Sequence, residues 1–61
     1  MEVVNIYERM EPSKAASILE NMEDRNMVVI ILKNMQKEKA SAILEEMHPD
    51  IATEIIHKMI Y

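Results

Sequence analysis

The sequence contains no cysteine, no glycine, no tryptophan and no phenylalanine. Without cysteine, neither a disulfide bond nor a thiolate metal site can stabilise the chain. Without glycine, the chain lacks the loop that cradles phosphate groups in nucleotide-binding proteins. Because the only aromatic residues are two tyrosines, the interior must be filled by aliphatic side chains and by the seven methionines.

Basic residues are also scarce, since seven Lys and Arg face eleven Asp and Glu and give a net charge of −4. Nucleic-acid sites need clustered Lys and Arg, so we expect no nucleic-acid partner. No apolar run approaches the roughly 20 residues that cross a bilayer, and no signal peptide is visible. We therefore expect this segment itself to make no membrane contact.

One spacing of apolar residues recurs five times along the chain. Positions i, i+3, i+4 and i+7 place their side chains on one face of a helix. Each set ends in methionine, and the sets follow one another at steps of 12 or 13 residues. The five sets are Val3/Ile6/Tyr7/Met10, Ala15/Ile18/Leu19/Met22, Val28/Ile31/Leu32/Met35, Ala40/Ile43/Leu44/Met47 and Ala52/Ile55/Ile56/Met59. The repeat predicts five amphipathic helices with a shared interior.

Prolines and an aspartate indicate where these helices begin. Pro12 and Pro49 suit the first helical position, where the missing N–H is no loss. Asp24 is a good N-cap for the third helix, whereas Gln36 is a weaker one for the fourth. We predict helices at about 2–10, 12–22, 25–35, 37–47 and 49–60, an estimate that follows from this spacing. Short turns fold such helices back on one another, so we predict an all-α fold, a compact solenoid-like superhelical bundle. Residues 1–61 would then form a single domain of a longer protein.

Several apolar residues lie off the predicted core face, most of them in the run from Met27 to Leu32. These residues, together with Val4 in the first helix, can complete the core, or they can form an exposed patch for another protein or a second copy of the chain. Methionine-rich and isoleucine-rich patches suit such contacts. The predicted partner-binding patch comprises Met27, Val29, Ile30, Ile51 and Ile60.

Residues able to carry out chemistry are few and scattered. His48 and His57 are the only candidate bases, and neither has a serine at helical spacing on the same face, so we predict no catalytic residues and no enzyme. Glu54 and His57 form one Glu-x-x-His unit, but di-metal bundles need two. We expect no metal and no cofactor. As a weaker alternative, a divalent cation could be bound by Glu23, Asp24, Glu45, Glu46 and Asp50.

Three segments carry a resemblance to a known family. They read MEPSKAASILENM at 10–22, VVIILKNM at 28–35 and KASAILEEMHP at 39–49. They resemble the MgtE N-terminal domain superfamily, with its M-x-P-x-x-A-A-x-I-L-x-x-M signature, and the likeness extends from Met10 to Met59. The last unit departs from the doubled alanine, because Thr53 follows Ala52.

The resemblance implies two alternative functions. The first is a non-catalytic protein–protein interaction module of a flagellar motor, similar to MotE-like stator chaperones or to the middle domain of FliG, with a motor or stator component as partner. The alternative is the cytosolic Mg²⁺-sensing domain of an MgtE-type magnesium transporter, with Mg²⁺ held by the acidic residues. Both imply a bacterial protein that is cytoplasmic or membrane-associated through parts outside this sequence.

Overall fold

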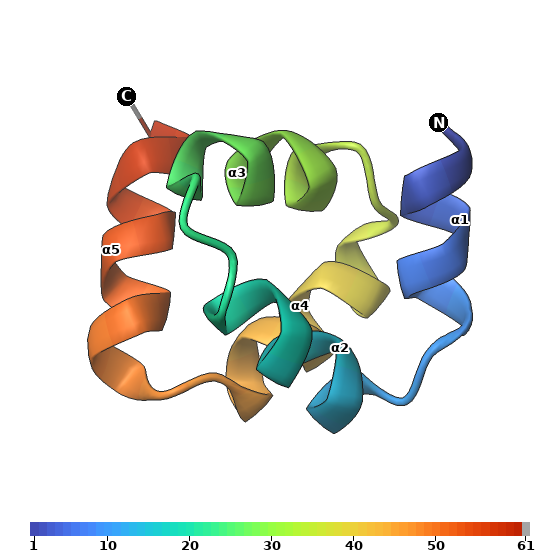
Figure 1. Ribbon diagram of the computed structural model, residues 1–61, viewed down its shortest axis with the longest axis horizontal. Coiled ribbons are helices and arrows are strands. Elements are labelled where there is room, and N and C mark those ends of the chain that lie inside the picture. The colour runs from blue at the N-terminus through green and yellow to red at the C-terminus, as the bar shows by residue number, and fades with distance from the viewer. Residues whose placement is uncertain (61) are drawn as a thin grey trace.

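The computed structural model describes residues 1–60, which form five α-helices (Figure 1). The helices are α1 (Glu2–Arg9), α2 (Pro12–Glu20), α3 (Arg25–Lys33), α4 (Lys37–Glu46) and α5 (Pro49–Ile60). No strand occurs among these residues, so the prediction of an all-α fold of five helices is confirmed. The first four helices end one or two residues earlier than predicted, because the methionines that close their repeats lie in the connections.

The starts of the helices follow from local chemistry. Pro12 occupies the first turn of α2, after Glu11 in extended backbone. The side chain of Asp24 caps α3 by accepting hydrogen bonds from the backbone N–H groups of Asn26 and Met27, at 3.1 and 3.4 Å. No described residue has a positive φ, so none of the connections in this part of the chain needs glycine.

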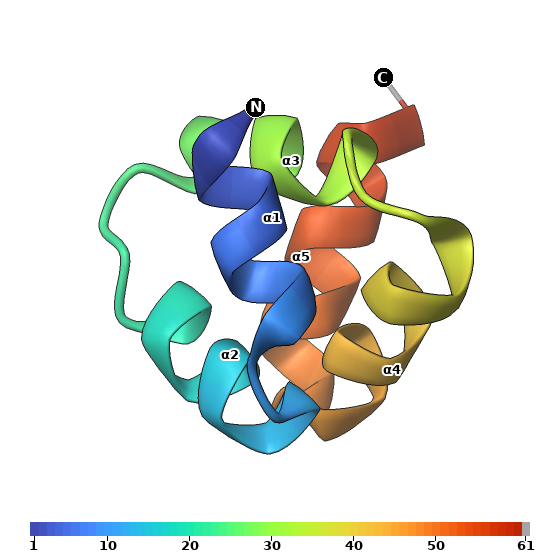
Figure 2. The same ribbon diagram turned by 90° about the vertical axis from the view of Figure 1, so that its right-hand side faces the viewer.

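The helices are arranged around a common interior. In Figures 1 and 2, α3 lies at one end of the molecule, α2 and α4 lie at the other, and α1 and α5 connect the two ends along the flanks. The pairs α2–α4, α3–α5 and α1–α3 pack against each other. The molecule measures 24 × 21 × 20 Å, which is the compact superhelical bundle that the repeat predicts.

The core is entirely apolar. Among its largest fully buried side chains are Leu19, Ile31 and Ile55, and none of the described polar or charged residues is buried. Ala15 and Ala16 are also buried, and their small side chains let α4 approach α2 closely. The complete set is Val4, Tyr7, Ala15, Ala16, Leu19, Val28, Val29, Ile31, Leu32, Met35, Ala40, Ile43, Met47 and Ile55.

In α3, all four residues predicted to face the core are buried, and in α4 three of the four are buried. In α1, α2 and α5, some of the residues predicted to face the core are exposed. In α1, Val4 is 3% exposed, whereas Val3 and Ile6 are 39% and 58% exposed. A flanking helix is covered on one narrow side, and in α1 that side is centred on Val4 and Tyr7. Ile18 of α2 and Ile56 of α5 are exposed as well.

Candidate functional site

The apolar patch predicted for partner binding is present in part. Met27 and Ile30 are 44% and 46% exposed on α3, and Ile60 is 68% exposed at the end of α5. The prediction is wrong for Val29, which is buried in the core. It is also wrong for Ile51, which is half-buried and packs against the core. Val29 is buried because α3 packs against both α1 and α5, and these two neighbours together cover a wide arc of the helix.

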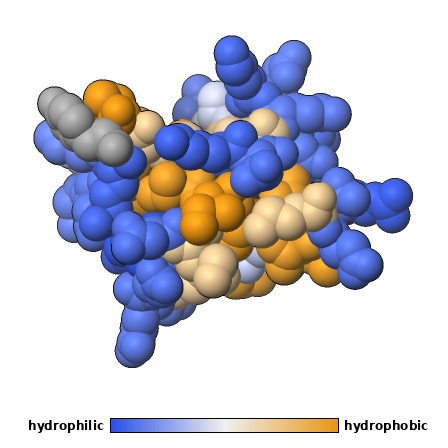
Figure 3. Space-filling view, turned by 90° about the horizontal axis from the view of Figure 1, so that it is seen from above, coloured by the Kyte–Doolittle hydropathy of each residue, from blue (hydrophilic) through white to orange (hydrophobic). Residues whose placement is uncertain are grey.

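Five further apolar residues are exposed, although the repeat assigns them to the core or leaves them out. They are Met1, Val3, Ile6, Ile18 and Ile56. The first turn of α1, which carries Val3, lies beside α3 at the same end of the molecule in both ribbon views. Figure 3 looks onto this end and shows an apolar area in its middle, with hydrophilic surface above it and at the left and right. The exposed residues of α3 therefore belong to a broader apolar face.

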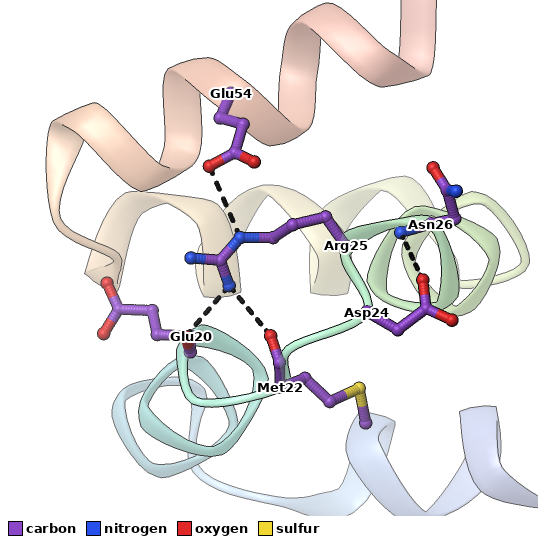
Figure 4. A network of polar contacts seen from close by, with 6 residues as sticks. All are labelled: Glu20, Met22, Asp24, Arg25, Asn26 and Glu54. Carbon is purple, nitrogen blue, oxygen red and sulfur yellow. Dashed lines mark hydrogen bonds and ion pairs between the residues drawn. The ribbon is translucent and has the colours of Figure 1, made fainter.

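Arg25 joins the α2–α3 connection to α5 (Figure 4). Its Nη1 donates to the backbone carbonyl oxygens of Glu20 and Met22, at 2.9 and 3.1 Å, while its Nε lies 3.4 Å from Oε1 of Glu54. The Glu20 carbonyl belongs to the last turn of α2, where backbone acceptors have no partner within the helix, and the Met22 carbonyl belongs to the connection that follows. Arg25 therefore satisfies backbone acceptors at the end of α2 and in the α2–α3 connection.

Two glutamates each accept a backbone N–H at the start of a different helix, from a residue 28 positions further along the chain. Oε2 of Glu8 accepts the backbone N–H of Gln36 at 2.9 Å, just before α4. Oε2 of Glu20 accepts the backbone N–H of His48, just before α5, and lies 2.9 Å from Nδ1 of the same histidine. The carboxylates therefore stabilise the positive ends of α4 and α5 from outside those helices.

The contact between Glu20 and His48 shifts the pKa of both groups. The backbone hydrogen bond from His48, followed by the bond to its ring, lowers the pKa of Glu20 below 4.5. The hydrogen bond to Glu20, followed by its charge, raises the pKa of His48 above 6.5. The side chain of Glu20 is 12% exposed and that of His48 is 76% exposed, so solvent screens the charge of the pair. The pair is therefore a structural link between α2 and the start of α5.

The acidic residues proposed as cation ligands do not converge. The carboxylate of Asp24 caps α3, and Glu23 is exposed just before it. The other three residues are exposed around the α4–α5 connection: Glu45, Glu46 and Asp50. Within residues 1–60, no three His, Cys, Asp or Glu residues form a group that could hold a metal ion. Glu54 faces Arg25, and His57 is exposed on α5. The surface of this part of the chain contains no pocket.

The chain matches a family over almost its whole length. The model of the MgtE intracellular N domain matches residues 1–60, and the chain belongs to this family. Neither the comparison with curated proteins nor that with solved structures gave a match. The family match favours the transporter-type interpretation over the flagellar one. Among residues 1–60, no helix has both the length and the hydropathy needed to span a membrane.

Proposed function

We propose that this chain is the cytosolic N domain of an MgtE-type magnesium transporter and acts as a non-catalytic regulatory module. The observation that carries this proposal is the family match over residues 1–60. The surface agrees with a role in domain contact, because it has exposed aliphatic residues on several helices and no pocket among the described residues. Regulation would consist of a change in how this domain contacts the rest of the transporter.

We infer that the domain's own carboxylates do not make a complete Mg²⁺ site. Mg²⁺ requires octahedral coordination by oxygen, usually with one or two carboxylates and several waters in addition to other ligands. The acidic residues of the described chain contribute isolated pairs, such as Glu45 and Glu46 on the last turn of α4. On this proposal, sensing of Mg²⁺ by this module uses oxygen ligands from another part of the transporter.

The isolated domain directly tests whether the Mg²⁺ ligands lie partly outside it. Its melting temperature should be the same with and without millimolar Mg²⁺, because a ligand stabilises a protein only when it binds the folded state. The control is an equal ionic strength of NaCl. A clear upward shift that is specific to Mg²⁺ would show that the domain carries a complete cation site.

The regulatory role is tested in the full-length protein. Removal of residues 1–60 should leave transport active but abolish its dependence on Mg²⁺ concentration. The double substitution Glu45→Gln/Glu46→Gln should weaken this dependence, whereas Glu38→Gln, on the first turn of α4, should not. Unchanged Mg²⁺ dependence after the deletion would contradict the proposal. So would a full-length protein with an upstream coiled coil and no membrane-spanning helices, which would support the flagellar interpretation.

A further inference from the structure

Burial along the repeat changes in one direction from the first helix to the last. Position i+3 of the repeat is isoleucine in every unit. It is exposed in the first two helices, at Ile6 and Ile18, and buried in the last three, at Ile31, Ile43 and Ile55. This change follows the main packing pairs, α1–α3, α2–α4 and α3–α5, because only the last three helices have a partner two units before them.

Positions i+1 and i+4 of the repeat show the opposite change. Both are buried in the first three helices, at Val4, Tyr7, Ala16, Leu19, Val29 and Leu32. In α4 and α5, the residues at i+1 are exposed, whereas Leu44 and Ile56 at i+4 are half-buried and 42% exposed. Each helix therefore packs against the unit two before it on one side, through i+3, and against the unit two after it on the other side, through i+1 and i+4.

The array consequently has two open edges, and the last one is the more polar. At position i+1 it carries Ser41 and Thr53, where the first three helices carry valine or alanine. The hydroxyl groups of these residues donate to the backbone carbonyls of Glu38 and Pro49, at 3.2 and 2.7 Å. Polar residues on the outer side of a terminal repeat suit contact with water. The last edge is therefore adapted to exposure.

The first edge consists of Ile6 on α1 and Ile18 on α2, and it keeps the isoleucines that are buried in the other units. They are 58% and 46% exposed, and Val3, one turn before Ile6, is exposed as well. In Figure 2, α1 faces the viewer and the start of α2 lies below it. The neighbours at helical spacing include both Glu2 and Lys14, so the edge has no single sign of charge. Apolar shape must therefore select its partner.

We propose that the first edge binds a pair of amphipathic helices of another protein, in the position that α1 and α2 occupy against α3 and α4. Each bound helix presents a small or β-branched residue and, three residues later, a large one, as Ala16 and Leu19 do. This arrangement continues the α1–α3 and α2–α4 packing by one more pair of units. A second copy of the chain fits less well, because its open edge would bury Ser41 and Thr53. The proposal does not depend on the transporter role.

A peptide with the sequence of residues 1–22 that carries Ile6→Glu and Ile18→Glu is the probe for this edge. It keeps the side of α1 and α2 that covers later helices, while the substitutions prevent it from binding further copies of itself. At up to about 1 mM, the peptide should shift the NMR signals of the Ile6 and Ile18 methyl groups of the domain. The control peptide also carries Tyr7→Glu and Leu19→Glu, which remove the covering side, and it should cause no shift.

Substitutions in the domain test the placement. Ile18→Glu should weaken binding of the peptide at least about tenfold, because the new charge would lose water in the complex. Ile30→Glu on α3 is the matched control, since Ile18 and Ile30 are both 46% exposed, and it should bind the peptide as the wild-type domain does. Circular dichroism checks that each variant remains folded.

Three results would overturn the proposal. The first is a domain whose spectrum does not change at about 1 mM peptide. The second is a shift confined to Ile56, which would place the contact on the last edge. The third is self-association of the free domain that Ile18→Glu abolishes, which would make a second copy, and not another protein, the occupant of the first edge.

Discussion

At the scale of single residues, one carboxylate has two partners in the same amino acid. Glu20 accepts the backbone N–H of His48 and also contacts the ring nitrogen Nδ1 of that residue. The backbone bond persists whatever the charge of the ring, whereas the ring contact is strongest when the imidazole is protonated. The link between α2 and the start of α5 is therefore only partly sensitive to pH.

This link predicts a specific dependence of stability on pH. The pKa of Glu20 is lowered on folding, so its contribution is complete above its ordinary value of 4.5 and is lost as the pH falls through the lower, folded value. The pKa of His48 is raised, so its contribution is complete below its ordinary value of 6.5 and is lost as the pH rises through the higher, folded value. Both contributions are complete between pH 4.5 and 6.5.

Measurement of the His48 titration by NMR tests the pair directly. The midpoint should lie above 6.5 in the wild-type domain and move down toward that value in Glu20→Gln. Glutamine retains an oxygen that can accept the backbone N–H but has no charge to favour the imidazolium ion. An unchanged midpoint in Glu20→Gln would show that the ring contact does not set the pKa of His48.

Arg25 gives a second prediction at this scale. Arg25→Ala should lower the free energy of unfolding by about 1–2 kcal/mol, because it leaves the backbone carbonyls of Glu20 and Met22 without their donor. Glu54→Gln should cost less than about 0.5 kcal/mol, since the side chain of Glu54 is 47% exposed and such ion pairs contribute little. Urea unfolding of both variants measures the difference. Equal losses would show that the ion pair, and not the bonds to the carbonyls, is the important contact.

At the scale of helices, α3 and α4 begin in different ways. Asp24 caps α3 with its own side chain, as its sequence position predicts. Gln36 makes no side-chain capping bond, and the backbone N–H of Gln36 is instead bound by Glu8 of α1. The start of α4 thus depends on a tertiary contact.

This contrast predicts the effect of three substitutions. Asp24→Ala should destabilise the domain by about 1 kcal/mol, the usual cost of losing an N-cap. Glu8→Ala should cost about 0.5–1.5 kcal/mol, whereas Gln36→Ala should be nearly neutral because the Gln36 side chain makes no cap. Thermal unfolding at one pH provides the comparison. A larger effect for Gln36→Ala than for Glu8→Ala would contradict this account of the α4 start.

The helices also show what could be predicted from the sequence. Periodicity located all five, and proline and aspartate located three of their starts, because these signals act within a few residues. The periodicity could not show that Val4 is buried and Val3 exposed, because this depends on which side of α1 the neighbouring helices cover. It also missed the bonds from Glu8 and Glu20, because partners 28 residues apart meet only after the superhelix has formed.

At the scale of the whole molecule, the size of the core limits stability. A chain of 61 residues seldom obtains more than about 3–5 kcal/mol from its core. Short helices such as these are marginal in isolation, so their formation depends on mutual burial. Local damage to the core should therefore affect the entire domain and not one helix.

The substitution Leu19→Ala tests this dependence. Leu19 is 0% exposed, and removing a buried leucine typically costs about 2–5 kcal/mol, which is close to the whole stability expected. We expect a largely unfolded chain at 25 °C by circular dichroism. Leu44→Ala, at a half-buried position on α4, should remain folded with a lower melting temperature. If Leu19→Ala loses only the α2 signal and keeps the other helices, the domain is not a single cooperative unit.

The paired bonds of Glu8 and Glu20 have a consequence for the construction of artificial arrays. Each acid stands two residues before the methionine that closes its unit, and each bound N–H follows the closing methionine of the unit two further along. The same hydrogen bond, from a glutamate to a backbone N–H two units further along, could hold additional units of the same length in a designed array. Lys33 occupies the equivalent position of the third unit and has no acceptor oxygen in its side chain. Exchanging it for glutamate would be the first step in extending the array by the same rule.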